Sequence, residues 1–229
     1  MTSKIAVADT TGGCDRQLGI TRSLLGWGIV AGPVYLVAGL TQAFTRPGFD
    51  IGRHALSLLE NGHLGWIQIG NFLLTGLMVV AGAIGVRRVL HPGRGGTAGP
   101  LLVGAYGAGV FLAGIFHADP TDGFPPGTPP GPGETTWHGL LHMASFGVGF
   151  LCLIAACFVV ARGLSARGQR RSAWGSRVAG LALFACVVAT FAAAGTTVAL
   201  VALWAAVVLA WAWVTVVSAR LMKEAGSAR

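Results

Sequence analysis

The chain has 229 residues, of which 53% are hydrophobic and only 10% are charged, and its mean hydropathy is +0.67. Soluble domains carry about 25% charged residues, so this composition excludes an ordinary soluble domain. The net charge is +8, but Lys and Arg lie in short clusters between apolar runs and no nucleic-acid motif is present, so nucleic acid is excluded as a partner. We therefore interpret the chain as a series of membrane-spanning helices, each of which needs roughly 20 apolar residues to cross a bilayer.

The first two predicted spans cover residues 24–44 and 64–86, on either side of a polar loop. Gly28 and Gly32 in the first span have the GxxxG spacing that lets a neighbouring helix approach closely. In the loop, the leucines of residues 55–59 suit a short helix on the membrane interface.

The third and fourth predicted spans cover residues 99–116 and 137–161 and enclose a Pro/Gly-rich hairpin. The run at 178–217 is too long for one span, and the break at 194–197 divides it into spans five and six. We therefore predict an all-α fold, a bundle of six transmembrane helices. The predicted organisation is an N-terminal tail, one membrane domain and a C-terminal tail, at residues 1–22, 23–218 and 219–229.

With six spans, both termini lie on one side of the membrane. That side holds 14 of the 16 Lys and Arg residues. The positive-inside rule places it in the cytoplasm, so we expect a multi-pass protein of the cytoplasmic membrane with both termini cytoplasmic.

Titratable side chains gather on the opposite, outer side. This set is His54, His63, His117, His138, His142, Asp50, Glu60, Asp119, Asp122 and Glu134. In a chain so poor in ionisable groups, a one-sided cluster at a membrane boundary indicates a functional site.

His138 and His142 are spaced i, i+4, so both imidazoles project from one helical face and can bind a single metal ion. His117 and Asp119 end the preceding span, and a helical hairpin brings them alongside. These four residues suit zinc with an open position for water, which can attack an ester, amide or phosphodiester. The spacing arises often by chance, so zinc is a candidate and no cofactor is assigned.

Three other interpretations of these histidines stay open. They can be structural, hydrogen-bonding carboxylates or backbone groups where helix ends meet. They can act without metal as a general acid–base pair in hydrolysis, isomerisation or proton-initiated cyclisation of a lipid-like substrate. They can also ligate haem, but no second histidine pair lies deeper in the membrane, which disfavours haem.

The first outer loop, residues 45–63, suits recognition of a lipid headgroup, because Arg46 or Arg53 can hold a phosphate in a bidentate contact. A solvated loop with weak local ion pairs is the alternative. Gln68, Asn71 and Thr75 share one face of the second span, which we expect to point into the bundle, to line a cavity or to form interhelical hydrogen bonds. The candidate substrate-binding residues are Arg46, Asp50, Arg53, His54 and Asn71.

Four motifs occur in the outer loops and at the adjoining ends of the spans: R-P-G-F-D-x-x-x-H-x-L-S-L-L, G-H-L-G-W-I-Q-x-x-N-F, G-I-F-x-x-D-P-x-x-G-F-P-P-G and W-H-G-x-L-H. With them, residues 27–217 resemble the bacterial and archaeal membrane proteins of domain-of-unknown-function family 998. The resemblance implies a six-span membrane protein and no established reaction. Its matching polar residues are Asp50, His54, Ser57, Asn71, Asp119, Pro120, His138 and His142.

The leading hypothesis is a membrane-embedded enzyme that acts at the outer side on a lipidic or amphipathic substrate drawn from the membrane. Its candidate metal ligands or acid–base groups are His117, Asp119, His138 and His142, and its supporting catalytic residues are Ser57 and Glu60. The rival hypothesis is a non-catalytic protein that binds or translocates lipid or assists another membrane protein.

Overall fold

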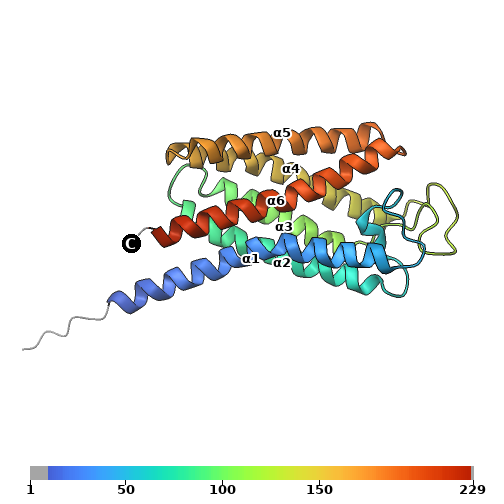
Figure 1. Ribbon diagram of the computed structural model, residues 1–229, viewed down its shortest axis with the longest axis horizontal. Coiled ribbons are helices and arrows are strands. Elements are labelled where there is room, and N and C mark those ends of the chain that lie inside the picture. Colours follow the sequence, from blue (N-terminus) through green and yellow to red (C-terminus); the bar gives the residue numbers. More distant parts are fainter. Residues whose placement is uncertain (1–9, 228–229) are drawn as a thin grey trace, which may run out of the picture.

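The computed structural model describes residues 10–227 and folds them almost entirely into helices (Figure 1). The long helices are α1 (Thr10–Thr45), α2 (Gly65–Leu90), α3 (Ala98–Ile115), α4 (Trp137–Ala166), α5 (Arg170–Ala192) and α6 (Thr197–Ser227). A short 3-10 helix, η1 (Leu56–Glu60), lies between α1 and α2. All six long helices are long and apolar enough to cross a membrane, and no strand forms within residues 10–227. The predicted all-α fold with six transmembrane helices is therefore confirmed.

The first and last helices run beyond the predicted limits of the membrane domain. Residues 10–22, expected in the N-terminal tail, begin α1, and residues 219–227, expected in the C-terminal tail, end α6. The remaining tail residues, 1–9 and 228–229, lie outside the described residues. Both described ends of the chain lie at the same end of the bundle, since an even number of antiparallel helices returns the chain to where it began (Figure 1).

The helices form a closed ring in chain order. Each helix packs against the next, and α1 closes the ring against α6. A Cβ built on Gly82 of α2 would lie 2.8 Å from Gly28 Cα of α1, so only glycine allows this crossing. Both glycines also face α6, where a Cβ would lie 2.5 Å from the Ser218 hydroxyl oxygen at Gly28 and 3.0 Å from the Trp211 side chain at Gly32. The GxxxG spacing thus lets two different helices approach α1 closely.

The end of the bundle away from the termini, called the outer end below, is covered by η1 and the hairpin at residues 118–136 (Figure 1). The sequence predicts the η1 leucines on the membrane interface, but Leu56, Leu58 and Leu59 are at most 5% exposed inside the protein. Phe124 of the hairpin is fully buried beside them in the same core. The leucines point inward because the hairpin and the helix ends give them a protein core to fill.

The polar face of α2 points into the bundle, as predicted. Gln68 and Thr75 are fully buried and Asn71 is 5% exposed. Gln68 Oε1 accepts a hydrogen bond from Gln42 Nε2 at 3.0 Å, and Asn71 Nδ2 donates to the Tyr35 carbonyl oxygen at 3.1 Å. These bonds join α1 to α2. Of the two roles that the sequence allows for this face, lining a cavity or forming interhelical hydrogen bonds, the structure shows the second.

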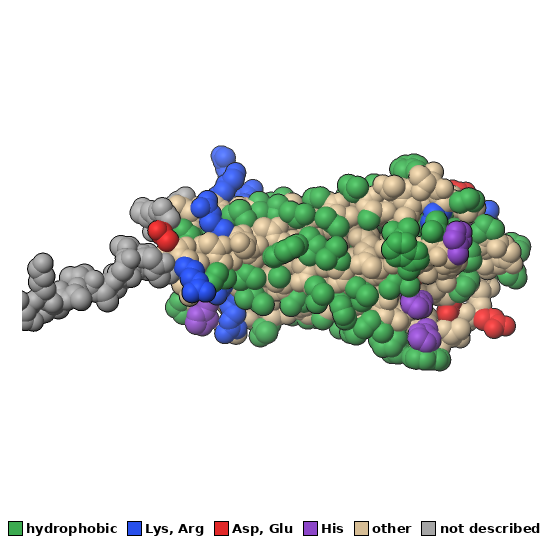
Figure 2. Space-filling view, turned by 90° about the horizontal axis from the view of Figure 1, so that it is seen from below, with side chains coloured by type: hydrophobic (Ala, Val, Ile, Leu, Met, Phe, Trp, Pro, Cys, Tyr) green, Lys and Arg blue, Asp and Glu red, His purple; other side chains and the backbone are tan. Residues whose placement is uncertain are grey.

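Charged side chains are distributed unevenly between the two ends of the molecule. On the face shown in Figure 2, most Lys and Arg side chains surround the end where the termini lie, and most histidine side chains lie near the outer end. Most of the histidines visible on this face therefore lie at the end that carries η1 and the hairpin.

Candidate functional site

Glu60, the last residue of η1, places a carboxyl group inside the outer end. Its side chain is fully buried. Oε2 accepts a hydrogen bond from the Ala118 amide at 3.0 Å, whereas Oε1 has no hydrogen-bond partner among residues 10–227. Burial raises the pKa of Glu60 from 4.5 to about 8, and the Ala118 hydrogen bond offsets this only in part. The carboxyl group is therefore mostly protonated at neutral pH.

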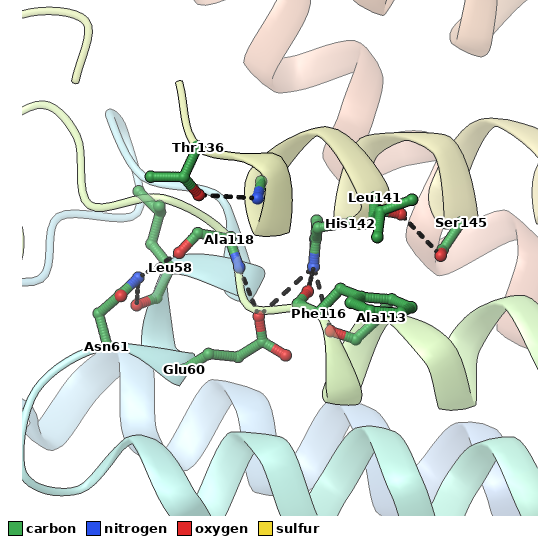
Figure 3. Close-up of polar contacts among 11 residues, drawn as sticks. Leu58, Glu60, Asn61, Ala113, Phe116, Ala118, Thr136, Leu141, His142 and Ser145 are labelled. Carbon is green, nitrogen blue, oxygen red and sulfur yellow. Dashed lines mark hydrogen bonds and ion pairs between the residues drawn. The ribbon is translucent and has the colours of Figure 1, made fainter. Parts of the chain in front are cut away.

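His142 lies on the buried face of α4, pointing toward Glu60 (Figure 3). Its Nδ1 lies 2.9 Å from the Phe116 carbonyl oxygen, 3.1 Å from the Ala113 carbonyl oxygen and 3.5 Å from Glu60 Oε2. Carbonyl oxygens only accept hydrogen bonds, so Nδ1 carries the proton of the neutral imidazole and Nε2 carries the lone pair. Within the described residues, no hydrogen bond engages Nε2.

His142 also lines a cavity within the bundle. The cavity holds about 660 Å³ of empty space, counted out to its mouth. This volume includes open solvent at the mouth, so the enclosed part of the cavity is smaller. Its wall is rich in aromatic side chains and otherwise mostly apolar, and the aromatic residues are Tyr35, Phe72, Tyr106, Phe146, Phe150, Trp204 and Trp211. An apolar chain therefore fits the wall better than a sugar or a charged metabolite.

Few polar groups reach this cavity besides His142. Ser57, from the η1 segment, and Ser145, from α4, line it, and the Ser145 hydroxyl donates to the Leu141 carbonyl oxygen at 2.7 Å. Trp204 lines it as well, and its buried Nε1–H has no hydrogen-bond partner in the part of the chain that the structure describes. These groups can orient the polar part of a bound molecule near His142.

The four predicted metal ligands do not converge. The rings of His117 and His138 stack nearly parallel, with centroids 6.1 Å apart. The Asp119 carboxylate instead accepts hydrogen bonds from the Thr136 amide, at 2.8 Å, and from the Thr136 hydroxyl, at 2.6 Å. His142 Nδ1 is engaged by backbone carbonyl groups. Within the described part of the chain, no three His, Cys, Asp or Glu side chains are grouped to hold a metal ion, so the predicted four-ligand site is not formed.

Asp119 has a structural position at the start of α4. Thr136 is the N-cap of this helix, and its hydroxyl accepts a hydrogen bond from the Gly139 amide at 3.2 Å. By binding Thr136 twice, Asp119 fixes the cap that begins the helix carrying His138 and His142.

Arg46, predicted to bind a headgroup, is buried and bound within the protein. Its guanidinium group donates to the carbonyl oxygens of Leu59 and Asn61 and lies over the Phe124 ring, 5.1 Å from the centroid. These contacts satisfy carbonyl groups at the end of η1. Arg46 therefore holds η1 and the hairpin together.

His54 is also engaged on both sides of its ring. Nδ1 accepts a hydrogen bond from the Asp50 amide at 2.9 Å, and Nε2–H donates to the Asp122 carbonyl oxygen at 3.1 Å. The Asp50 carboxylate accepts from the Gly52 amide at 2.8 Å. Since His54 is 2% exposed, its role in this structure is to join the first outer loop to the hairpin.

The remaining predicted residues are separated. Arg53 is exposed on the first outer loop, Asn71 is buried between α1 and α2, and Ser57 lines the cavity. Of the predicted catalytic set, the structure brings Glu60 and His142 together and places Ser57 on the same cavity as His142.

Sequence reasoning missed the aromatic wall of the cavity. Tyr35, Tyr106 and Trp211 lie on three different helices, and each is an ordinary residue of an apolar span. Their ring contacts, such as the 4.8 Å separation of the Tyr35 and Trp211 centroids, depend on helix packing that no local pattern reveals.

No curated protein and no solved structure matches this chain. A family model described as a protein of unknown function (DUF998) matches residues 29–220, from within α1 to near the end of α6. Because the match covers most of the chain, the chain belongs to the DUF998 family.

Proposed function

We propose that this protein is an integral membrane enzyme that transfers protons on a lipidic or amphipathic substrate at its outer end. The observation that carries the proposal is the position of His142: its Nδ1–H is held by the Ala113 and Phe116 carbonyl oxygens, and the residue lines an intramembrane cavity. An imidazole fixed through one nitrogen, with a lone pair on the other, has the arrangement of a general base.

In the proposed reaction, the apolar chain of the substrate lies against the aromatic wall and its polar group lies at His142. Nε2 takes a proton from the substrate, and the resulting imidazolium keeps donating from Nδ1 to the two carbonyl oxygens. Glu60, with Oε2 3.5 Å from Nδ1, is a positioning residue; it is mostly protonated at neutral pH, and the fraction that is ionised stabilises that charge. Return of the proton to another substrate atom gives isomerisation. In hydrolysis Nε2 would instead take the proton from a water molecule, whose oxygen attacks the substrate while the imidazolium gives that proton to the leaving group.

The acid–base interpretation is preferred to metal-assisted hydrolysis on the positions of the side chains. The Asp119 carboxylate accepts two hydrogen bonds from Thr136, and the His117 and His138 rings stack on each other. Proton transfer by His142 beside Glu60 does not require the other predicted metal ligands to converge on the same point.

The test uses purified protein reconstituted into liposomes made from its native membrane lipids. Lipid species are compared by mass spectrometry before and after incubation, and we expect the wild-type protein to convert at least one species. The His142→Ala variant is expected to abolish the conversion, while His63→Ala, which alters an exposed histidine of the first outer loop, leaves it unchanged. Full conversion by a folded His142→Ala variant, or none by the wild type, would overturn the proposal.

A second candidate function is lipid binding without catalysis, which the almost wholly apolar wall of the cavity favours. It predicts that one lipid species copurifies unchanged with the protein. Such a lipid would be retained equally by the wild type and the His142→Ala variant, whereas an enzyme would hold substrate in the variant and product in the wild type.

For orientation, we propose that the outer end faces away from the cytoplasm and that the membrane is the cytoplasmic membrane. The proposal rests on the 14 of 16 Lys and Arg residues that belong to the segments on the terminal side. A fluorescent protein fused to the C-terminus is expected to fluoresce, and alkaline phosphatase fused there is expected to be inactive. The reverse pattern would refute the orientation.

A further inference from the structure

A groove lies between α5 and α6 at the end where the termini lie, separate from the His142 cavity. It holds about 690 Å³ of empty space, counted out to its open side. Its apolar part includes Ala179, Ala212 and Val216, and the last two are exposed on the outside of the bundle. Because α5 and α6 are membrane-spanning helices, this part of the groove faces lipid.

Two arginines at one end of the groove have no acidic partner. Arg171 lies in the first turn of α5 and Arg220 in the last part of α6, and both are exposed. Arg220 Nη1 donates to the Ser172 hydroxyl, which holds this guanidinium group at the boundary between the helices. Among the described residues neither arginine pairs with Asp or Glu, whereas nearby Arg167 pairs with Glu224 at 2.6 Å.

The groove has the depth of one lipid leaflet. Its wall on α6 runs from Leu209 to Leu221, which at 1.5 Å per residue is about 18 Å along the helix. Half of the hydrocarbon core of a bilayer is about 15 Å. The two arginines therefore lie at headgroup level when the apolar part of the groove lies at acyl-chain depth.

We propose that this groove binds one anionic phospholipid. Its phosphate lies between Arg171 and Arg220, and one acyl chain lies along Ala179, Ala212 and Val216. Guanidinium groups bind phosphate through charge-assisted hydrogen bonds, and basic pockets between transmembrane helices are recognised sites for anionic headgroups. A zwitterionic lipid brings an ammonium group to the same two arginines and binds more weakly.

The experiment is a lipid titration of the full chain in detergent, followed by native mass spectrometry. Phosphatidylglycerol and phosphatidylcholine with the same acyl chains are the two probes, and we expect one saturable site that prefers phosphatidylglycerol. Removing one arginine is expected to weaken that site about fivefold, and the Arg171→Ala/Arg220→Ala double variant about 30-fold. The control Arg87→Ala/Arg94→Ala removes the same charge from two exposed residues outside the groove and is expected to leave the affinity unchanged.

A second variant tests the acyl part of the groove without altering charge. Ala212→Trp fills the space beside Val216 and is expected to lower phosphatidylglycerol binding. Its unfolding temperature is expected to equal that of the wild type, which shows that the variant is folded. Equal affinity for the two lipids, equal weakening by the control variant, or full binding by Ala212→Trp would each overturn the proposal. The proposal would also be overturned if the wild-type protein were a dimer and the Ala212→Trp variant a monomer, because the groove would then hold a second copy of the chain.

Discussion

The Glu60→Gln substitution tests the environment of the buried carboxyl group at the outer end. The folded-state pKa of about 8 lies above the ordinary value of 4.5, so between these values the folded protein holds a proton that the unfolded chain has lost. Stability is therefore highest at low pH in this window and falls as pH rises through it. From pH 6 to pH 8, at about 1.36 kcal/mol per unit and with half-titration at pH 8, the loss is about 2 kcal/mol.

Glutamine has the same shape, still offers an oxygen to the Ala118 amide and does not titrate. The expected result is that the wild-type unfolding temperature falls by roughly 4–8 °C more between pH 6 and pH 8 than that of Glu60→Gln. Thermal unfolding in detergent, followed by tryptophan fluorescence, measures this difference. The comparison removes the contributions of the histidines, which both proteins share.

Glu134→Gln is the matched control, because Glu134 is exposed in the hairpin. It is expected to keep the full pH dependence of the wild type. If Glu60→Gln shows the same fall as the wild type, Glu60 is already ionised at pH 6, and the reasoning from its burial is wrong.

Three further outcomes are expected. His54→Ala leaves the Asp50 amide and the Asp122 carbonyl group without their partner and is expected to lower the unfolding free energy by about 1–3 kcal/mol in chemical denaturation, whereas the exposed His63→Ala is expected to change it little. Thr136→Ala removes the cap of α4 and is expected to cost about 1 kcal/mol, and it should be non-additive with an Asp119 substitution, so additivity in a double-mutant cycle would contradict the shared contact. Elemental analysis is expected to find less than one zinc per chain, and stoichiometric zinc lost on His138→Ala would restore the metal-centre interpretation.

The fold was predictable because membrane insertion depends on properties that are local in the sequence. Each apolar run is long enough to cross a bilayer, and the small and polar residues around Gly195 divide the last run where the structure ends α5 and begins α6. The exact helix ends were less predictable, since α1 continues as a helix through residues with no strong hydropathy signal.

The candidate site was predictable only as a set of residues at one end. Asp119 has the chemistry of a metal ligand, but the structure uses it to bind the N-cap of α4, and sequence spacing cannot distinguish these roles. His54 likewise has a ligand's chemistry and no free nitrogen. The meeting of Glu60 with His142 depends on η1 turning inward, which follows from packing between segments far apart in the chain.

The closure of the ring by α1 and α6 has a consequence for biosynthesis. Leu203, Trp204 and Trp211 of α6 supply one wall of the His142 cavity, and Gly32 of α1 receives α6 at close range. Since α6 leaves the ribosome after α1 to α5, the cavity exists only after all six of these helices have been inserted. Until then, the inner aromatic faces of α1 and α3 lie open to lipid, so a chain that loses α6 loses the site together with the helix that seals it.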